Sequence, residues 1–67
     1  MWQVTFENKR GGSSIKRISD KKNLIEFVSK LKTEATIWYN HKIDGRVWKN
    51  QESNKWNWYF GEYSINE

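Results

Sequence analysis

The chain has 67 residues, no Cys and no Pro, and its twelve Lys and Arg against eight Asp and Glu give a net charge of +4. So short a chain has room for one small domain over residues 1–67, and with one His and no Cys it has neither disulfides nor the ligands of a structural zinc site. No apolar run is long enough to span a bilayer and no signal-peptide pattern opens the chain, so we expect a cytoplasmic protein.

The first segment alternates apolar and polar residues. Trp2, Val4 and Phe6 share one face of an extended segment, which predicts a half-buried strand. A turn-rich stretch over residues 7–14, with two consecutive glycines, then leads to a second short apolar segment at residues 15–18. We interpret this region as a β-hairpin with a flexible tip.

A helical repeat follows the hairpin. Its apolar residues recur at the i, i+3, i+4 and i+7 spacing of one helix face and are Leu24, Ile25, Phe27, Val28 and Leu31. Ser19 or Asp20 can cap the first turn, and Lys30 and Lys32 suit the partial negative charge at the helix end. The sequence therefore predicts an amphipathic helix that fades by residues 33–35.

Strand-forming residues dominate the second half of the chain. β-Branched and aromatic side chains concentrate in three stretches, residues 37–40, 46–50 and 55–60. Asp44-Gly45 is a strong hairpin signal between the first two stretches, and a polar connection precedes the third. We therefore predict an α+β fold of order β-β-α-β-β-β, in which one amphipathic helix packs on one face of an antiparallel sheet.

Two hairpin registers at Asp44-Gly45 give the aromatic residues different faces. A two-residue loop places Trp48 with Ile37 on the helix side of the sheet. A three-residue loop with a glycine bulge moves Trp48 to the other face, together with Trp38. We favour the second register, because it makes one side of the sheet apolar and leaves polar residues and aromatic rings on the other.

The last predicted strand alternates in the same manner. Trp56, Trp58 and Phe60 lie on one side and are expected to pack against the helix, while Tyr59 joins the opposite face. That face would carry an exposed aromatic patch with cations, formed by Trp38, Lys42, Arg46, Trp48 and Tyr59. The same rings would also serve stability alone, because a small sheet with one covering helix can protect its second face with large side chains.

Positive charge concentrates in the N-terminal third of the chain. Residues 9–22 hold six of the twelve cations and one of the eight acids. Lys21 and Lys22 lie in the first helical turn, where cations oppose the helix dipole and where free N–H groups can receive an anion. The pattern predicts an anion or nucleic-acid contact formed by Lys9, Arg10, Lys16, Arg17, Lys21 and Lys22. A solvated, solubilising lysine cluster is the alternative.

The sequence lacks the usual catalytic constellations. His41 is the single His, no Cys is available to pair with it, and no Ser lies in a nucleophile-elbow motif. The eight acids are scattered over predicted turns and the helix, so no pair of carboxylates is expected to converge in a cleft. We therefore expect a non-enzymatic protein without cofactor or metal.

Three binding functions are compatible with this sequence. In the first, cations contact the phosphates of a nucleic acid while Trp38, Trp48 and Tyr59 stack on its bases. In the second, the chain binds and blocks a nucleic-acid-handling protein. Over its whole length, in size and in its Lys-, Asn- and Ile-rich composition, it resembles the small inhibitors of phages and mobile elements, anti-CRISPR proteins among them, without sharing a motif. In the third, a nucleotide is sequestered between Trp faces and basic residues.

Overall fold

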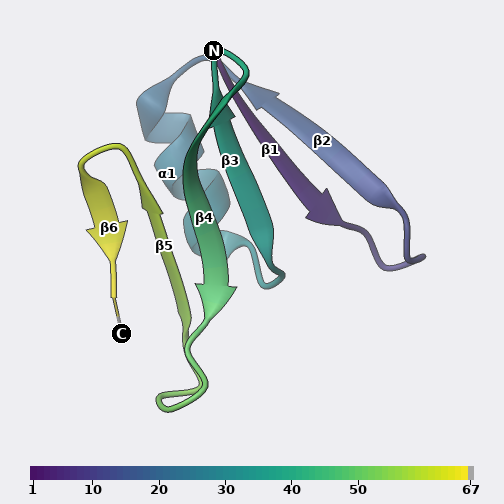
Figure 1. Cartoon of the computed structure of the whole chain (residues 1–67), viewed down its shortest axis with the longest axis vertical. Coiled ribbons are helices and arrows are strands. Elements are labelled where there is room, and N and C mark those ends of the chain that lie inside the picture. Colours follow the sequence, from purple (N-terminus) through teal and green to yellow (C-terminus); the bar gives the residue numbers. More distant parts are fainter. Residues whose placement is uncertain (67) are drawn as a thin grey trace.

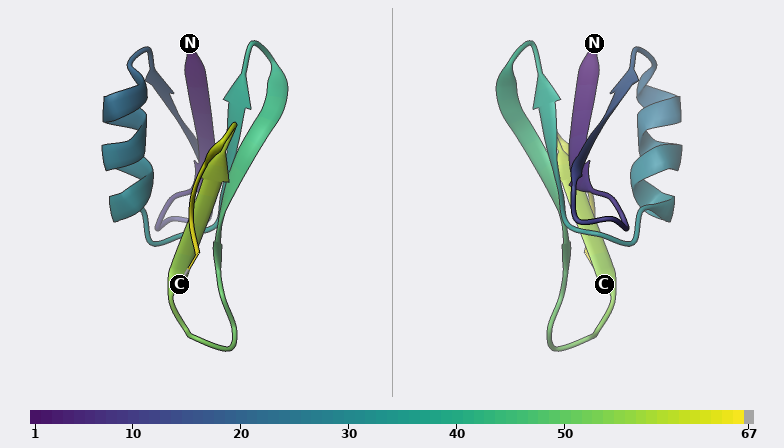
Figure 2. Two further views of the ribbon diagram at one scale, coloured as in Figure 1. Left: turned by 90° about the vertical axis from the view of Figure 1, so that its left-hand side faces the viewer. Right: turned by 90° about the vertical axis from the view of Figure 1, so that its right-hand side faces the viewer.

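A six-stranded antiparallel sheet with one short helix on one of its faces forms the protein (Figure 1, Figure 2). The structure is a computed structural model and describes residues 1–66. In chain order the elements are β1 (Trp2–Glu7), β2 (Ser13–Ile18), α1 (Lys21–Lys30), β3 (Ala35–Tyr39), β4 (Lys42–Lys49), β5 (Trp56–Phe60) and β6 (Tyr63–Ile65). Across the sheet the strands follow the order β2-β1-β3-β4-β5-β6. The α+β class is confirmed, whereas the predicted element order lacked β6, whose three residues are too few to show a period.

The hydrophobic core lies between α1 and the sheet face turned toward it (Figure 2). Leu24 and Val28 of α1 are buried there, as the helical spacing predicted. The sheet completes the core with Val4, Ile18, Ala35, Ile37, Val47, Trp58 and Phe60. Trp58 and Phe60 are 6% and 1% exposed, which confirms their predicted place in the core, and Trp56 packs against it half-buried.

Asp20 is the N-cap of α1. Its backbone is extended, and its carboxylate accepts a hydrogen bond from the backbone N–H of Lys22 at 3.2 Å, which satisfies one of the free donors of the first turn. At the other end Leu31 leaves the helical conformation, and its backbone N–H donates to the Val28 carbonyl at 3.3 Å. The helix therefore ends without a glycine or proline, and four residues separate it from β3.

The β1–β2 tip is a hydrogen-bonded turn. The side-chain Oδ1 of Asn8 accepts from the backbone N–H groups of Arg10 at 3.0 Å and Gly12 at 3.1 Å, and its Nδ2 donates to Ser14 Oγ at 3.2 Å. Gly11 has a φ of 83°, a left-handed conformation that glycine adopts without strain. The glycine-rich segment thus has a defined geometry set by Asn8, where its composition had indicated a loose loop.

The β3–β4 turn does not lie at Asp44-Gly45, so both predicted registers were wrong. Tyr39 pairs directly with Lys42, and the two residues between them, Asn40 and His41, have φ values of 49° and 66°. Positive φ at both central positions is the signature of a type I′ turn, whose twist matches that of the flanking strands. The sequence concealed this turn because Gly, and not His, is its usual second residue.

Gly45 instead lies inside β4, at a close approach of β5. It pairs with Phe60, and a Cβ placed on it would collide with the backbone oxygen of Tyr59 and lie 2.7 Å from Phe60 Cα. Asp44 is the extra residue of a β-bulge, since the register between β3 and β4 skips it. The Asp-Gly pair therefore marks a bulge followed by a close backbone approach.

Candidate functional site

The sheet face opposite α1 is covered by no other helix or strand of residues 1–66 (Figure 2). We call it the outer face, and strand pairing arranges its side chains in rows across the sheet. One row holds Arg17, Gln3, Trp38 and Ile43; the next holds Ile15, Thr5, Thr36, Arg46, Tyr59 and Ser64; a third has Trp48 beside Asn57. Trp38 and Trp48 share this face, as the favoured register predicted. The observed two-residue turn is followed by the bulge at Asp44, and together they place the side chains of β4 after residue 44 on the same faces as the predicted bulged turn would.

Trp38 is half-buried and anchored on the neighbouring strand. Its Nε1–H donates to Thr5 Oγ1 at 3.0 Å, and the Thr5 hydroxyl in turn donates to the Thr36 carbonyl at 3.5 Å. The first bond satisfies the only polar group of the indole and holds the ring over β1. Because the ring is fixed before any ligand arrives, binding to it costs less conformational entropy.

Trp48 and Tyr59 form a second aromatic group on β4 and β5. Their ring centroids lie 5.9 Å apart at 68°, the edge-to-face geometry that aromatic pairs prefer. Tyr59 is 39% exposed, and the exposed Arg46 is its cross-strand neighbour. Asn57, which pairs with Trp48, is only 2% exposed, so neighbouring side chains cover the sheet at this position. The second group is therefore packed against a buried neighbour while Tyr59 still presents ring surface to solvent.

Arg17 and Arg46 supply the positive charge of the outer face. Neither forms an ion pair within residues 1–66, and the carboxylate on this face, Glu7, lies at the end of β1 beside the hairpin tip. A polar hollow of about 600 Å³ opens next to Arg46 at the same end of the sheet and includes Thr36 and Lys49 in its lining. The outer face thus brings aromatic rings and unpaired guanidinium groups together.

Lys42 does not belong to the outer face, which corrects the predicted sheet-face site. It pairs with Tyr39, and the Tyr39 ring packs against Trp2 on the helix side with centroids 4.9 Å apart. The bulge at Asp44 shifts the alternation of side chains along β4 by one residue. Lys42 and Ile43, which precede the bulge, therefore lie on the opposite faces to those that an unbroken strand would give them. Ile43, which is 62% exposed, occupies the outer position instead.

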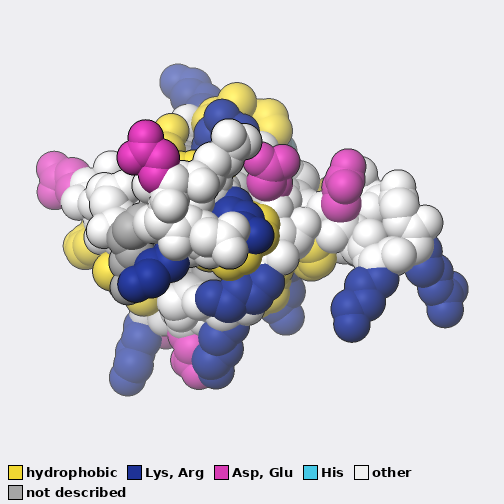
Figure 3. All heavy atoms as spheres, turned by 90° about the horizontal axis from the view of Figure 1, so that it is seen from below, with side chains coloured by type: hydrophobic (Ala, Val, Ile, Leu, Met, Phe, Trp, Pro, Cys, Tyr) yellow, Lys and Arg dark blue, Asp and Glu magenta, His cyan; other side chains and the backbone are white. Residues whose placement is uncertain are grey.

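The six cations of the predicted anion site do not come together. Lys9 and Arg10 lie at the β1–β2 tip, and the start of α1 lies at the opposite end of β2 (Figure 1). Within β2, alternation turns Lys16 toward the helix side and Arg17 toward the outer face. Seen from below, the Lys and Arg side chains form separate groups on the surface (Figure 3). Of the six, Arg17 is the residue that shares a face with the aromatic rings.

The two lysines at the start of α1 form hydrogen bonds within the chain, Lys21 through its side chain and Lys22 through its backbone. The Nζ of Lys21 donates to the Tyr63 hydroxyl at 2.9 Å and lies 4.6 Å from the Tyr63 ring centroid. This hydrogen bond, with smaller electrostatic contributions from Tyr63 and Glu62, raises the pKa of Lys21 above its ordinary value of 10.5. The backbone N–H of Lys22 is already bonded to Asp20. The helix start therefore offers an anion fewer free donors than its sequence indicated.

Sequence reasoning missed two exposed apolar residues of the outer face. Ile15 and Ile43 are 60% and 62% exposed. The predicted apolar segment at residues 15–18 grouped Ile15 with Ile18, yet the two are three residues apart and so take opposite faces of β2. Strict alternation along β2 would have predicted that Ile15 lies on the same face as Arg17. The position of Ile43 on the outer face could be predicted only if the bulge at Asp44 were known.

The outer face offers rings, guanidinium groups and hydroxyls, which are groups for binding. His41, the single His of the chain, is exposed in the β3–β4 turn. Within residues 1–66 no group of three or more His, Asp or Glu side chains is placed to hold a metal ion. The same residues include no helix whose length and apolar content would let it cross a lipid bilayer.

Comparison of the chain with protein-family models, curated proteins and solved structures found no match.

Proposed function

We propose that the protein is a non-enzymatic binding protein that holds single-stranded nucleic acid on its outer face. The observation that supports this most is the juxtaposition of Trp38, the Trp48–Tyr59 pair and Arg46 on a sheet face that no other described element covers. Bases stack on aromatic rings whatever their sequence, and guanidinium groups bind phosphates. Sheet faces with exposed rings are a known geometry for the recognition of unpaired bases.

The order of groups on the outer face fits the order of groups along a nucleic-acid strand. Arg46 lies in the row between Trp38 and Trp48, so that ring, guanidinium and ring succeed one another along β3 and β4. Successive rows on one face of a sheet are two residues, or roughly 7 Å, apart. A strand laid along β4 would therefore place a base on each indole and a phosphate at Arg46. Arg17, at the β2 edge of the Trp38 row, would receive a second phosphate.

The remaining cations have a different role in this proposal. Lys9 and Arg10 at the hairpin tip are exposed and unpaired within residues 1–66, but they lie at the far end of the hairpin from Arg17. They contribute to long-range attraction of a polyanion at low salt and make no contact with bases. We assign direct contact with phosphates to Arg17 and Arg46. Of the six cations that the sequence predicted for an anion contact, Arg17 is therefore kept, and Arg46 is added from the predicted aromatic patch.

Titration of the intrinsic Trp fluorescence with an oligodeoxythymidylate at several salt concentrations tests this function. Two phosphate contacts predict a slope of log Kobs against log salt of about −1.4, because each contact to a single strand contributes about −0.7. Arg46→Gln is expected to reduce the slope by about 0.7. Trp48→Leu is expected to weaken binding about 5- to 150-fold, because stacking on one ring contributes about 1 to 3 kcal/mol.

Lys22→Gln is the matched control for Arg46→Gln. It removes one positive charge from the start of α1, away from the outer face, and leaves the capping bond intact because Lys22 takes part in that bond through its backbone. Its salt slope should equal that of the wild type. An affinity that does not change with salt, or equal losses in the two variants, would contradict the proposal.

A further inference from the structure

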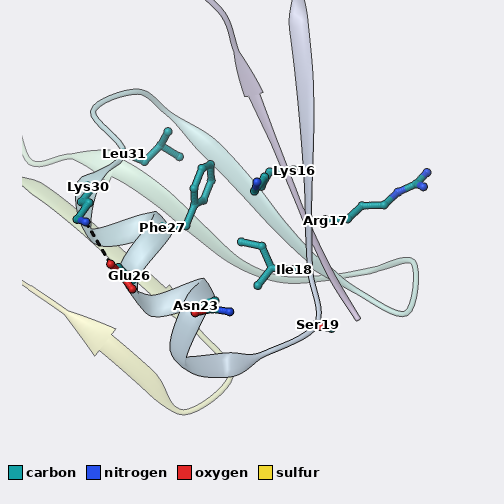
Figure 4. A pocket seen from close by; sticks show the side chains of 9 residues that line it. All are labelled: Lys16, Arg17, Ile18, Ser19, Asn23, Glu26, Phe27, Lys30 and Leu31. Carbon is teal, nitrogen blue, oxygen red and sulfur yellow. Dashed lines mark hydrogen bonds and ion pairs between the residues drawn. The ribbon is translucent and has the colours of Figure 1, made fainter.

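A groove runs between α1 and β2 on the helix side of the sheet, away from the outer face (Figure 4). Its volume is about 540 Å³. Phe27 projects into it from α1, Ile18 faces it from β2, and Leu31 closes its apolar part. Phe27 and Leu31 are only half-buried, although both pack against the hydrophobic core. The groove therefore has an apolar floor bordered by polar and charged residues, and it remains open to solvent.

The groove is bordered by an edge strand whose backbone is free on one side. β2 lies at the end of the strand order and pairs with β1 alone within residues 1–66. It has six residues with an unbroken register and contains no Pro, Gly or bulge. An unpaired edge of this length presents a row of N–H and C=O groups that can pair with a further extended chain. The opposite edge, β6, has only three residues.

The charge along this edge is positive. Lys16 lines the groove and Arg17 points away from it, and neither has an ion pair within residues 1–66 (Figure 4). Glu26 on the facing side of the groove is already paired with Lys30 at 3.2 Å. The unpaired charges beside the free backbone edge are thus both cations, one on each side of β2. A segment that added to β2 would meet positive charge on both of its faces.

We infer that β2 and the α1–β2 groove form a docking site for an extended, acidic segment of a partner protein, which would add to the sheet as a seventh strand. Backbone hydrogen bonds to β2 supply affinity in this mode of binding, and pockets for alternate side chains supply specificity. Apolar side chains of the segment would enter the groove beside Phe27 and Ile18. Acidic side chains would lie beside Lys16 and Arg17. A nucleic acid would find phosphate partners here but would use neither the backbone edge nor the apolar floor.

A synthetic heptapeptide of alternating Glu and apolar residues, Glu-Val-Glu-Phe-Glu-Val-Glu with blocked ends and a fluorescent label, serves as the probe. Fluorescence polarisation should show saturable binding to the wild-type protein. The same peptide with N-methyl groups on the residues that face β2 should not bind, because it cannot form the backbone ladder. Replacing each Glu of the peptide by Lys should also abolish binding.

Protein variants then locate the site. Arg17→Glu, on the face that the Glu side chains of the peptide would occupy, should lower the affinity by up to about fivefold, the upper range for an exposed ion pair. Lys55→Glu, an equal charge change in the β4–β5 connection, should have no effect. Trp48→Leu should also have no effect, which separates this site from the proposed nucleic-acid function of the outer face.

Amide hydrogen exchange of the wild-type protein provides a readout that needs no variant. Added peptide should slow the exchange of β2 amides that point away from β1, and not of amides in β6. The inference is overturned if the peptide does not saturate, if the N-methylated peptide binds equally, or if protection appears at β6. The inference is also overturned if an oligonucleotide binds through Lys16 and the peptide does not. If no peptide binds, the inference is wrong, and the two cations serve only to keep the edge of β2 from pairing with another strand.

Discussion

Substitution of Gly45 by Ala tests the placement of the Asp-Gly pair inside β4. The added Cβ would collide with the Tyr59 carbonyl oxygen and lie 2.7 Å and 2.8 Å from Phe60 Cα and Cβ, and two of these three atoms belong to the backbone. β4 and β5 would have to separate across the centre of the core. Overpacking a core typically costs 1 to 3 kcal/mol and occasionally more, and we expect about 3 kcal/mol here because backbone cannot move aside as a side chain can.

This loss is large for so small a protein. At 0.05 to 0.15 kcal/mol per residue, a chain of this length has a free energy of unfolding of about 3 to 10 kcal/mol. The Tm should fall by about 12 to 24 °C, since a domain of this size loses about 4 to 8 °C per kcal/mol. Thermal and urea unfolding followed by far-UV circular dichroism measure both quantities.

Gly12→Ala is the matched control for Gly45→Ala. Its Cβ would approach only the side chain of Asn8, at 3.3 Å, so the expected change in unfolding free energy is within about 0.5 kcal/mol. If Gly45 were a turn residue, replacing it by Ala would cost about 1 kcal/mol, as elsewhere for glycine in a left-handed conformation. A loss of 1 kcal/mol or less would therefore refute the close approach of β5.

Three further predictions concern the turn, the anchored indole and the helix start. His41→Gly should raise the unfolding free energy by about 0.5 to 1 kcal/mol in urea titrations, because it relieves the positive φ of 66° and creates the preferred Asn-Gly turn; a destabilised variant would argue against the turn. Thr5→Val removes the acceptor for the Trp38 N–H and should cost about 1 kcal/mol, measured the same way. Lys21→Gln should lower the Tm at neutral pH, and the difference in Tm from the wild type should shrink above pH 10.5. The reason is that a raised lysine pKa stabilises the folded state only while the lysine is protonated. A difference in Tm that does not change with pH would contradict the hydrogen bond to Tyr63.

The elements with a clear period were predictable from the sequence. Burial of Leu24 and Val28 follows from their spacing of four residues, which places both on one side of a helix. Burial of Trp58 and Phe60 follows from alternation along a strand, and that alternation also placed Tyr59 on the outer face. These predictions succeeded because local periodicity and tertiary burial agree at these positions.

The β3–β4 hairpin was not predictable because its causes are not local. Gly45 is required by the approach of Phe60, which is fifteen positions further along the chain, and no turn rule contains this information. Because of the bulge at Asp44, Trp48 lies on the side of the sheet that was predicted from a different turn. The predicted side of Trp48 was therefore correct, although the predicted register was wrong. The side of Lys42, which precedes the bulge, could not be recovered in this way.

The six cations of the predicted anion site lie apart for a geometric reason. A strand rises about 3.3 Å per residue, so the six residues of β2 span roughly 20 Å and separate the hairpin tip from the start of α1. Lys16 and Arg17 are neighbours in sequence but project from opposite faces of that strand. Clustering of charge in a sequence therefore indicates a surface patch on a helix or loop far better than along a β-hairpin.

The indole N–H signals of the five Trp residues test the outer-face proposal most directly. In a ¹H–¹⁵N correlation spectrum, addition of an oligodeoxythymidylate of about eight nucleotides, within the usual site size for such surfaces, should shift the signals of Trp38 and Trp48. The signals of Trp2 and Trp58, which lie on the helix side of the sheet, should stay in place. Shifts at Trp2 or Trp58, or no shift at Trp38 and Trp48, would contradict binding of single strands on the outer face.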